Sequence, residues 1–344
     1  MADRKLSFGI IGCGKIAATH AQQMVSKGKL VAVCDVDEAK AKIMADRYKV
    51  PFYQNLETMF ARHPELDLVS VCTPNGLHAK HSITALNYGA HVICEKPMAL
   101  TVADCLDMMR AAEVAGKKLF VVKQNRYNPP VITLRNILNE NRLGRIFSIQ
   151  LNCFWNRGPH YYHDNWHGTK QLDGGTLFTQ FSHFIDLLVW LFGDIIELEA
   201  ITANYAHEGI IEFEDTGIIM LSFRQGAIGA VNYTVNSYAC NMEGSLTVFG
   251  EKGTLKIGGQ YLNNIEYCKI ENYEIPEHSE GNPANTYGGY SGSMSNHDKV
   301  FDNVIEVLQN KAKMTTSPED GLKTVEIINR IYAKARSPLM TSAR

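Results

Sequence analysis

The feature that most limits the fold of this chain is a series of short apolar runs in its first third, separated by segments with a helical period. Each run is continuous rather than alternating, which is typical of strands covered on both faces. Strands that alternate with helices in this way predict a doubly wound parallel sheet, whose ligands bind beyond the carboxyl ends of the strands. The predicted strands cover residues 6–12, 30–36, 66–73, 91–97 and 118–124.

The turn after the first predicted strand has the spacing G-x-G-x-x-A. Gly12 permits a tight turn, and Gly14 lets the main chain approach a pyrophosphate. The small side chain of Ala17 lets the next helix pack closely, with its N-terminus facing the phosphates. Lys15 and Ile16 lie inside the same turn. We therefore expect the whole turn to contact a dinucleotide.

An acidic residue, Asp35, ends the second predicted strand, 21 residues beyond Gly14. Its carboxylate can accept hydrogen bonds from a ribose 2′-hydroxyl and would repel a 2′-phosphate. The sequence therefore favours NAD over NADP as the cofactor. The alternative is a structural glycine turn followed by a solvated aspartate.

Polar residues follow the third predicted strand, in the stretch CTPNGLHAKH. Pro74 cannot continue a strand ladder, so the strand ends there and a helix starts. This places Thr73, Asn75 and His78 at the binding edge of the sheet, where we expect them to contact the cofactor. For His78 and the nearby His81, a solvated surface position is the alternative.

The stretch VICEKPMAL carries an ionisable residue, Lys96, to the end of an apolar run. The parallel arrangement puts this lysine at the same edge of the sheet as the glycine turn. Desolvation beside a positively charged nicotinamide should depress the pKa of Lys96, which makes it a candidate proton donor or hydrogen-bond partner for a reacting hydroxyl. Pro97 restricts Lys96 to extended backbone and so fixes its aim. The alternative is a solvated Lys96 paired with Glu95.

Composition argues against several classes of protein. The 344 residues carry a formal charge of -2 and no Lys/Arg-rich run interleaved with aromatics, which disfavours a nucleic-acid partner. The N-terminus lacks the pattern of a signal peptide and no long apolar run occurs, so we expect a cytoplasmic protein without membrane association. The eight cysteines lack CxxC spacing, and four of them lie within or beside apolar runs, which predicts buried thiols with no metal site and no disulfide; these are Cys13, Cys34, Cys72 and Cys94.

A different pattern begins at Arg145, where long runs alternate with a period of two residues. They predict strands with one covered face, and such a broad sheet needs a partner, which favours an oligomer. We place a cofactor domain over residues 1–125 and a substrate-binding and oligomerisation domain over 126–344. Within the second domain we expect a loop over 273–295 and helices near 296–310 and 317–335.

One expected helix of the second domain carries polar residues. Gly174 and Gly175 should open an amphipathic helix, on which Thr179 and His183 lie four residues apart and share a face. Histidine is a suitable general base near neutral pH, although a lone helical histidine can equally be a buried structural residue. The apolar face of this helix would come from Ile185, Leu188 and Leu191.

Six segments of the chain, taken in order, resemble the glucose-fructose oxidoreductase, inositol dehydrogenase and MocA family. They are GIIGCGKIA, CTPNGLHA, EKPMAL, KQNRYNP, DGGTLFTQFSHFIDLLVWLFG and FGEKGTLKI. The resemblance implies an NAD-dependent dehydrogenase acting on CH–OH, with an N-terminal Rossmann domain and a C-terminal α/β domain built on an open, mostly antiparallel sheet. It also implies catalytic roles for Lys96 and His183, cofactor contacts from Glu95, Lys96 and Asn125, and a homodimer or homotetramer formed through the sheet.

One position departs from the polyol enzymes of this family. Inositol-type members usually carry an aspartate four residues before the histidine, where this chain has Thr179. The stretch YYHDNWHGTKQLDGG is similar instead to a subgroup that acts on UDP-activated N-acetyl sugars, the UDP-N-acetyl-2-amino-2-deoxyglucuronate 3-dehydrogenases. His167, Lys170 and Thr179 differ from that subgroup as well, which leaves open whether the substrate carries a carboxylate.

The subgroup resemblance implies a reaction. Lys96 would hydrogen-bond the C3 hydroxyl of a UDP-N-acetyl-hexosamine or its uronate, His183 would accept its proton, and the C3 hydride would pass to NAD. The alternatives are an inositol or free-sugar dehydrogenase, an NAD-using glycosidase, and a non-catalytic dinucleotide sensor. The expected substrate contacts are Arg126, Tyr161, Asn165, Trp166, Thr169, Lys170 and Thr179.

Overall fold

The computed structural model describes residues 5–163, 166–275, 281–286 and 291–338. The chain forms two compact units. The first comprises Met1–Lys123 and His297–Val325, and the second comprises Gln124–Asn296 and Glu326–Arg344. Among the helices in the described ranges, none is long and apolar enough to cross a membrane.

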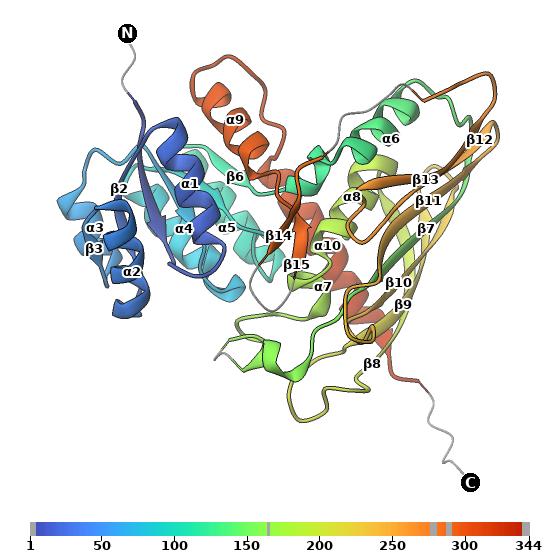
Figure 1. The fold of residues 1–344 in the computed structure, drawn as a ribbon, viewed down its shortest axis with the longest axis horizontal. Coiled ribbons are helices and arrows are strands. Elements are labelled where there is room, and N and C mark those ends of the chain that lie inside the picture. Colours follow the sequence, from blue (N-terminus) through green and yellow to red (C-terminus); the bar gives the residue numbers. More distant parts are fainter. Residues whose placement is uncertain (1–4, 164–165, 276–280, 287–290, 339–344) are drawn as a thin grey trace. The chain divides into compact units, whose positions relative to one another are not determined.

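The first unit is built on a six-stranded parallel sheet ordered β3-β2-β1-β4-β5-β6. Figure 1 draws this part of the chain in blue to blue-green. The order reverses direction between β1 and β4, so right-handed crossovers place the helices that follow these two strands on opposite faces. The predicted doubly wound parallel sheet is confirmed, although the two-residue β3 was not predicted. The strands are β1 (Ser7–Ile11), β2 (Lys29–Cys34), β3 (Phe52–Tyr53), β4 (Leu68–Val71), β5 (His91–Cys94) and β6 (Leu119–Val121), and the helices are α1 (Ala17–Lys27), α2 (Glu38–Tyr48), α3 (Leu56–Arg62), η1 (Asn75–Leu77), α4 (His78–Asn87) and α5 (Val102–Val114).

The first unit also contains a later segment, which the predicted boundary had assigned to the second domain. Helix α9 (His297–Leu308) contacts α1, and the segment continues into helix α10 (Pro318–Lys334). At Gly321 in α10, a Cβ would lie 2.7 Å from the sulfur of Met98. The predicted domain over 126–344 is therefore not one continuous unit, because the apolar face of α9 completes the core of the first unit. That face consists of the fully buried Val300, Phe301 and Val304.

The second unit is built on an eight-stranded sheet ordered β13-β12-β11-β7-β10-β9-β8-β16. Neighbouring strands are antiparallel except β7 with β10 and β8 with β16, so the expected mostly antiparallel sheet is confirmed. The strands are β7 (Ile146–Phe154), β8 (Ile195–Ala203), β9 (Thr216–Phe223), β10 (Ile228–Thr234), β11 (Glu243–Gly250), β12 (Gly253–Gly258), β13 (Asn264–Ile270) and β16 (Ala335–Arg336). The helices are η2 (Gln124–Tyr127), α6 (Pro129–Asn139), η3 (Pro159–Tyr162), α7 (Thr176–Thr179) and α8 (Ser182–Phe192).

Two expected features of the second unit differ from the structure. The segment 273–295, predicted as a loop, contains a small antiparallel pair, β14 (Ala284–Thr286) and β15 (Ser291–Met294). The single amphipathic helix expected after Gly175 is interrupted between α7 and α8, and α8 is buried on nearly all sides. The break falls at Phe181, whose φ of -118° and ψ of 7° are not helical and whose ring packs against Trp155.

Candidate active site

The turn after β1 has the geometry that a dinucleotide phosphate requires. Gly12 has φ +90°, and a Cβ there would lie 2.7 Å from the carbonyl carbon and oxygen of Cys72, so only glycine fits. Gly14 is exposed, and no atom of the described residues lies within 4 Å of the position that a Cβ would take. Space is therefore left beside the main chain of this turn. It lies just ahead of helix α1, whose N-terminus favours an anion.

Asp35 follows β2, and two main-chain amides fix its carboxylate. The amide of Cys13 donates to Oδ2 at 2.7 Å, and the amide of Asp37 donates to Oδ1 at 2.8 Å. The side chain is only half-buried, so further acceptor sites on both oxygens stay accessible. An oriented carboxylate at the end of β2 fits the ribose diol of NAD.

The polar residues after β4 are more buried than the sequence suggested. His78 is 1% exposed, and its ring nitrogens lie 2.7 Å from the carbonyl oxygen of Pro97 and 2.8 Å from that of Thr73. Burial lowers the pKa of His78, against the opposite effect of the two carbonyls. His81 lies 3.0 Å from the Thr73 hydroxyl, and burial lowers its pKa to about 4. The solvated alternative for His78 is wrong, and its contact with the cofactor, like those of Thr73 and the buried Asn75, stays a prediction.

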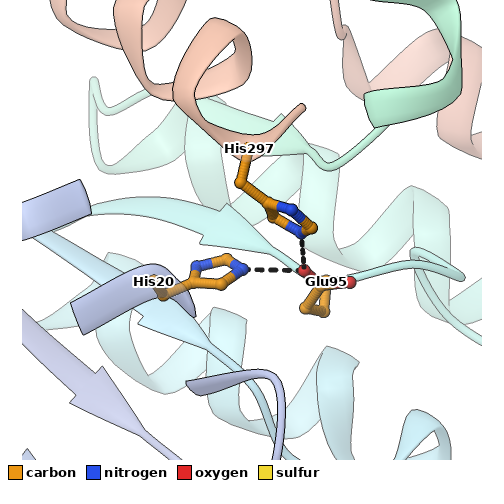
Figure 2. A group of neighbouring side chains, drawn as sticks. All are labelled: His20, Glu95 and His297. Carbon is orange, nitrogen blue, oxygen red and sulfur yellow. Dashed lines mark hydrogen bonds and ion pairs between the residues drawn. The ribbon is translucent and has the colours of Figure 1, made fainter. Parts of the chain in front are cut away.

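Lys96 follows the end of β5 and is half-buried. Its main-chain amide donates to Oε2 of Glu95 at 3.1 Å, while His20 and His297 lie against Oε1 (Figure 2). Glu95 is 6% exposed, so the alternative of a Lys96–Glu95 pair in solvent is wrong. A direct contact of Glu95 with the cofactor stays a prediction.

In the second unit, His183 on α8 is 4% exposed, and its Nε2 lies 3.1 Å from the side-chain nitrogen of Gln124. An amide nitrogen only donates, so Nε2 of His183 is the acceptor in this contact. The ring is thereby held in the tautomer that can accept a proton at Nε2. Gln124 was not predicted as a site residue. The sequence could have indicated it, because Gln124 comes just after a predicted strand and therefore lies at the carboxyl edge of the parallel sheet.

Thr179 ends α7, and its hydroxyl donates to Oδ1 of Asp173. Asp173 is 1% exposed, and its Oδ2 accepts a hydrogen bond from the amide of Gly168 at 2.7 Å. A carboxylate is therefore present beside position 179, supplied by the preceding turn. Because α7 and α8 are separate helices, the single helical face expected for Thr179 and His183 does not exist.

Side chains at the start of the second unit retain unused polar atoms. Within the described ranges, Oδ1 and Nδ2 of Asn125 and Oε1 of Gln124 are buried without a hydrogen-bond partner. Leaving a buried polar atom unpaired costs about 1–3 kcal/mol, so a ligand that pairs these atoms is favoured. A carboxamide such as that of nicotinamide offers both a donor and an acceptor. The orphaned atoms of Asn125 therefore fit the predicted NAD contact.

Arg126 was predicted to meet a diphosphate or a carboxylate of the substrate, but it is engaged within the second unit. Its Nε and Nη2 donate to the two oxygens of Asp186 at 2.8 and 2.7 Å, and the two side chains are 5% and 3% exposed. The guanidinium also lies 5.0 Å from the ring centroid of Trp190. We assign the charge of Arg126 to this two-pronged ion pair rather than to a substrate.

A second buried arginine, Arg157, organises the residues around Tyr161. Its Nε donates to Oε1 of Gln180 at 2.7 Å, and Nε2 of Gln180 donates to the Tyr161 hydroxyl at 2.9 Å. Arg157 is 2% exposed, and neither it nor Gln180 was predicted. The sequence could have indicated Arg157, because it is a charged residue close to a predicted strand. A charged residue that is buried needs several hydrogen-bond partners.

The other predicted substrate residues lie just before α7. The ring of Trp166 stacks on His167 with centroids 3.7 Å apart. The Thr169 hydroxyl donates to the carbonyl of Trp166 at 2.9 Å and accepts from the amide of Leu172 at 3.2 Å, so it stabilises a turn. Lys170 is exposed. Asn165 lies outside the described residues.

Two family models match the chain. One, described as "Oxidoreductase family, NAD-binding Rossmann fold", covers residues 6–123, and the other, "Oxidoreductase family, C-terminal alpha/beta domain", covers residues 135–338. The chain belongs to the glucose-fructose oxidoreductase, inositol dehydrogenase and MocA family. The predicted membership is confirmed, and the enzyme is an NAD-dependent dehydrogenase acting on CH–OH.

Relatives within this family include solved structures. The WlbA dehydrogenase from Bordetella pertussis, in complex with NADH and UDP-GlcNAcA, is 34% identical with a TM-score of 0.86, and the match covers 96% of each chain. WlbA from Chromobacterium violaceum, also with NADH and UDP-GlcNAcA, is 36% identical with a TM-score of 0.86, over 97% of this chain and 94% of that one. D-apiose dehydrogenase from Paraburkholderia graminis is 26% identical, over 97% of this chain and 88% of that protein.

Proposed function

We propose that this dehydrogenase oxidises the C3 hydroxyl of a UDP-N-acetyl-hexosamine or its uronate, producing a 3-keto sugar nucleotide. The observation that carries the proposal is the similarity, over 96% and 97% of the chain, to two dehydrogenases whose structures contain NADH and UDP-GlcNAcA. Their identities of 34% and 36% exceed the 27% identity with an inositol 2-dehydrogenase from Saccharopolyspora erythraea, a match over 73% of the chain.

Two side chains act on the hydroxyl in this proposal. His183 accepts the hydroxyl proton at Nε2, where the substrate hydroxyl takes the place of the Gln124 amide on the single lone pair. Lys96 donates a hydrogen bond to the same oxygen and stabilises the negative charge that develops there. Bound NAD supplies the hydride acceptor. The O–H and C3–H bonds break, a C=O bond forms, and one proton and one hydride leave the sugar.

The geometry of the first unit and the orphaned amide of Asn125 support the cofactor contacts that we propose. The open turn beside Gly14 holds the pyrophosphate, and the fixed carboxylate of Asp35 binds the adenosine ribose. Asn125 pairs with the carboxamide of the nicotinamide. The full proposed set is Gly12, Gly14, Lys15, Ile16, Asp35, Thr73, Asn75, His78, Glu95, Lys96 and Asn125.

The sugar contacts come from the segment around α7. Tyr161 is positioned by Gln180, and Thr179 is positioned by Asp173, so both hydroxyls have a fixed direction. The exposed Lys170 meets the diphosphate or a sugar carboxylate. Asn165, Trp166 and Thr169 complete the proposed set.

We propose a homodimer or homotetramer formed through the outer face of the eight-stranded sheet. Ile201 pairs with Ile218 in the sheet register, and Met220 and Ile228 lie further along the same face. All four are exposed, and a contiguous apolar surface of this kind is typical of an interface. Six of the eight cysteines are buried free thiols, which suits the reducing cytoplasm, the location that we propose.

The test is a nicotinamide absorbance assay of the purified protein with NAD. UDP-N-acetylglucosaminuronate, UDP-N-acetylglucosamine and myo-inositol are compared, with 2-oxoglutarate in a parallel set to reoxidise bound NADH. Reduction with a sugar nucleotide alone supports the proposal and shows whether a carboxylate is needed. Reduction with inositol alone, or release of free sugar from an aryl glycoside without net NADH, overturns it.

Two variants test the assigned roles. Lys96→Met and His183→Asn should retain NAD binding, measured by quenching of protein fluorescence, and lose most turnover. A near-wild-type rate in either variant removes that residue from the proposed mechanism.

A further inference from the structure

Three buried side chains from distant parts of the chain meet beside Lys96 in the first unit. His20 comes from α1, Glu95 follows β5, and His297 begins α9 (Figure 2). They are 0%, 6% and 1% exposed. The proposed chemistry uses neither histidine, so their convergence on one carboxylate needs its own explanation.

Both histidines donate to the same oxygen of Glu95. Nε2 of His20 lies 2.7 Å from Oε1, and Nε2 of His297 lies 3.2 Å from it. A carboxylate only accepts, so both Nε2 atoms carry hydrogens. The other oxygen, Oε2, accepts a hydrogen bond from the main-chain amide of Lys96 at 3.1 Å. These three hydrogen bonds, two to Oε1 and one to Oε2, fix the orientation of the Glu95 carboxylate.

The same donors keep Glu95 charged. Burial works to raise the pKa of Glu95, but the hydrogen bonds from His20 and His297 hold it well below its ordinary value. Burial lowers the pKa of His20, and the neutral ring places its Nδ1 2.8 Å from the hydroxyl of Ser70. The cluster therefore holds Glu95 as an oriented carboxylate next to the main chain of Lys96.

The two thiols near Glu95 are uncharged at neutral pH, because burial raises the pKa values of Cys72 and Cys94. His78, on α4, faces two carbonyl oxygens through its ring nitrogens, and burial lowers its pKa against their effect. Glu95 is the carboxylate that also holds the main-chain amide of Lys96.

We propose that His20 and His297 are positioning residues for Lys96. By fixing Glu95 as an oriented carboxylate, they set the main chain of the lysine and stabilise its protonated ammonium, the form that donates a hydrogen bond. This inference rests on the proposed role of Lys96 at the reacting hydroxyl. Helix α9, whose apolar face belongs to the core of the first unit, supplies one of the two donors.

A metal ion held by the same atoms is the competing explanation. The ligand atoms of His20, Glu95 and His297 lie within 4.8 Å of one another. The 2.7 Å between Nε2 of His20 and Oε1 is the distance of a charge-assisted hydrogen bond, and metal analysis of the purified protein decides between the two explanations. Zinc or another ion found at one per chain, and lost in His297→Leu, overturns the proposal.

The first experiment needs no sugar substrate. Lysines are dimethylated with ¹³C, the Lys96 signal is identified by its absence in Lys96→Arg, and its titration is followed by NMR. We expect Glu95→Gln to move the titration of Lys96 to lower pH by about one unit or more, because it removes the adjacent negative charge. His297→Leu should move it in the same direction, and His297→Gln, which keeps a donor nitrogen, should restore it. An unchanged titration in both Glu95→Gln and His297→Leu overturns the proposal.

The second experiment measures kinetics on whichever CH–OH substrate the wild type oxidises. His20→Leu and His297→Leu should lower kcat about tenfold or more, while the KM for NAD stays within about twofold, since misplacing one group affects the transition state most. His63→Leu, which removes the half-exposed pair with Glu65, is the matched control and should leave kcat unchanged. The proposal is overturned if the leucine variants lose kcat and NAD affinity to the same extent and His297→Gln does not restore kcat.

The two proposals fail in different ways. A wild type that does not oxidise sugar nucleotides overturns the proposed function, and the NMR titration still decides the role of the cluster. Glu95→Gln preserves the size of the side chain, so it keeps the test available if a leucine variant does not fold.

Discussion

Nε2 of His183 faces the side-chain amide of Gln124 at 3.1 Å, with both side chains buried. The contact decides which ring nitrogen can receive a proton, because an amide donor is satisfied only by a lone pair. A general base needs its lone pair on the atom that meets the substrate. In the proposed mechanism, Gln124 therefore holds His183 in the tautomer with its lone pair at Nε2 until the substrate hydroxyl takes the place of the amide.

Changing Gln124 to glutamate should move the pH dependence of the reaction. A carboxylate in place of the amide favours the protonated ring, which cannot accept a proton. We expect the acid limb of kcat/KM to move to higher pH and the rate near pH 7 to fall about tenfold or more, since general base catalysis contributes about 10²–10⁴-fold. Gln225→Glu, on an exposed turn of the same unit, is the charge-matched control. An unshifted profile in Gln124→Glu would falsify this role.

The carboxylate of Asp35 should set the preference for NAD over NADP. Asp35→Asn keeps an oxygen acceptor for one of the two amide hydrogen bonds and removes the charge that repels a 2′-phosphate. The ratio of kcat/KM for NAD to that for NADP should fall about tenfold or more, which corresponds to about 1.4 kcal/mol. The control is Asp37→Asn, which removes one negative charge two residues away, at the N-cap of helix α2. The same change of ratio in both variants would point to net charge rather than to a ribose contact.

Much of the first unit was predictable because its candidate site residues lie next to the ends of strands. Gly12, Asp35 and Lys96 each follow a continuous apolar run, so the order of runs alone placed them at one sheet edge. The partners that fix those residues were not predictable. Nothing local in the sequence links Glu95 to His297, 202 positions away, or Gln124 to His183, 59 positions away.

Physical signals for some missed features were nevertheless present. Asp186 stands within the apolar helix SHFIDLLVWLF, and a charge buried there requires a partner, which the structure supplies as Arg126. The helix break at Phe181 had no such signal. The ring of Phe181 packs against Trp155, a tertiary contact that helical periodicity does not reveal.

Removing one partner of the buried Arg126–Asp186 pair should destabilise the second unit more than removing both. Asp186→Leu leaves an unpaired buried guanidinium and should lower the free energy of unfolding by about 3–5 kcal/mol. Urea unfolding followed by tryptophan fluorescence measures this loss. The double variant Arg126→Met/Asp186→Leu should recover most of it, because neither charge then remains buried. Asp194→Leu, which breaks an exposed pair with Arg224, should change the free energy of unfolding by about 0–1 kcal/mol.

Glu214 should make the second unit less stable as pH rises. Burial raises the pKa of Glu214 from 4.5 to about 7, despite hydrogen bonds from the hydroxyls of Tyr233 and Tyr332. The folded state then holds the proton more tightly than the unfolded state, so stability is fully present below about pH 4.5 and is lost up to about pH 7, by about 3 kcal/mol in total. Glu214→Gln should flatten this dependence and be the more stable form at pH 8. Urea unfolding at a series of pH values measures it, with the exposed Glu208→Gln as the control. Parallel curves for wild type and Glu214→Gln would contradict the assignment.

The outer face of the eight-stranded sheet should carry the oligomer contact. Met220 is 62% exposed between Ile218 and Ile228 on that face, so Met220→Lys puts a charge into an apolar surface without touching the core. We expect sedimentation velocity to show the wild type as a dimer or tetramer and Met220→Lys as a monomer, with the thermal midpoint of the isolated chain preserved. Val114→Lys, an exposed valine on α5 of the other unit, should leave the assembly intact. A monomeric wild type, or a Met220→Lys variant that assembles normally, would mean that this apolar face is not the interface, because a buried unpaired lysine would otherwise cost several kcal/mol per contact.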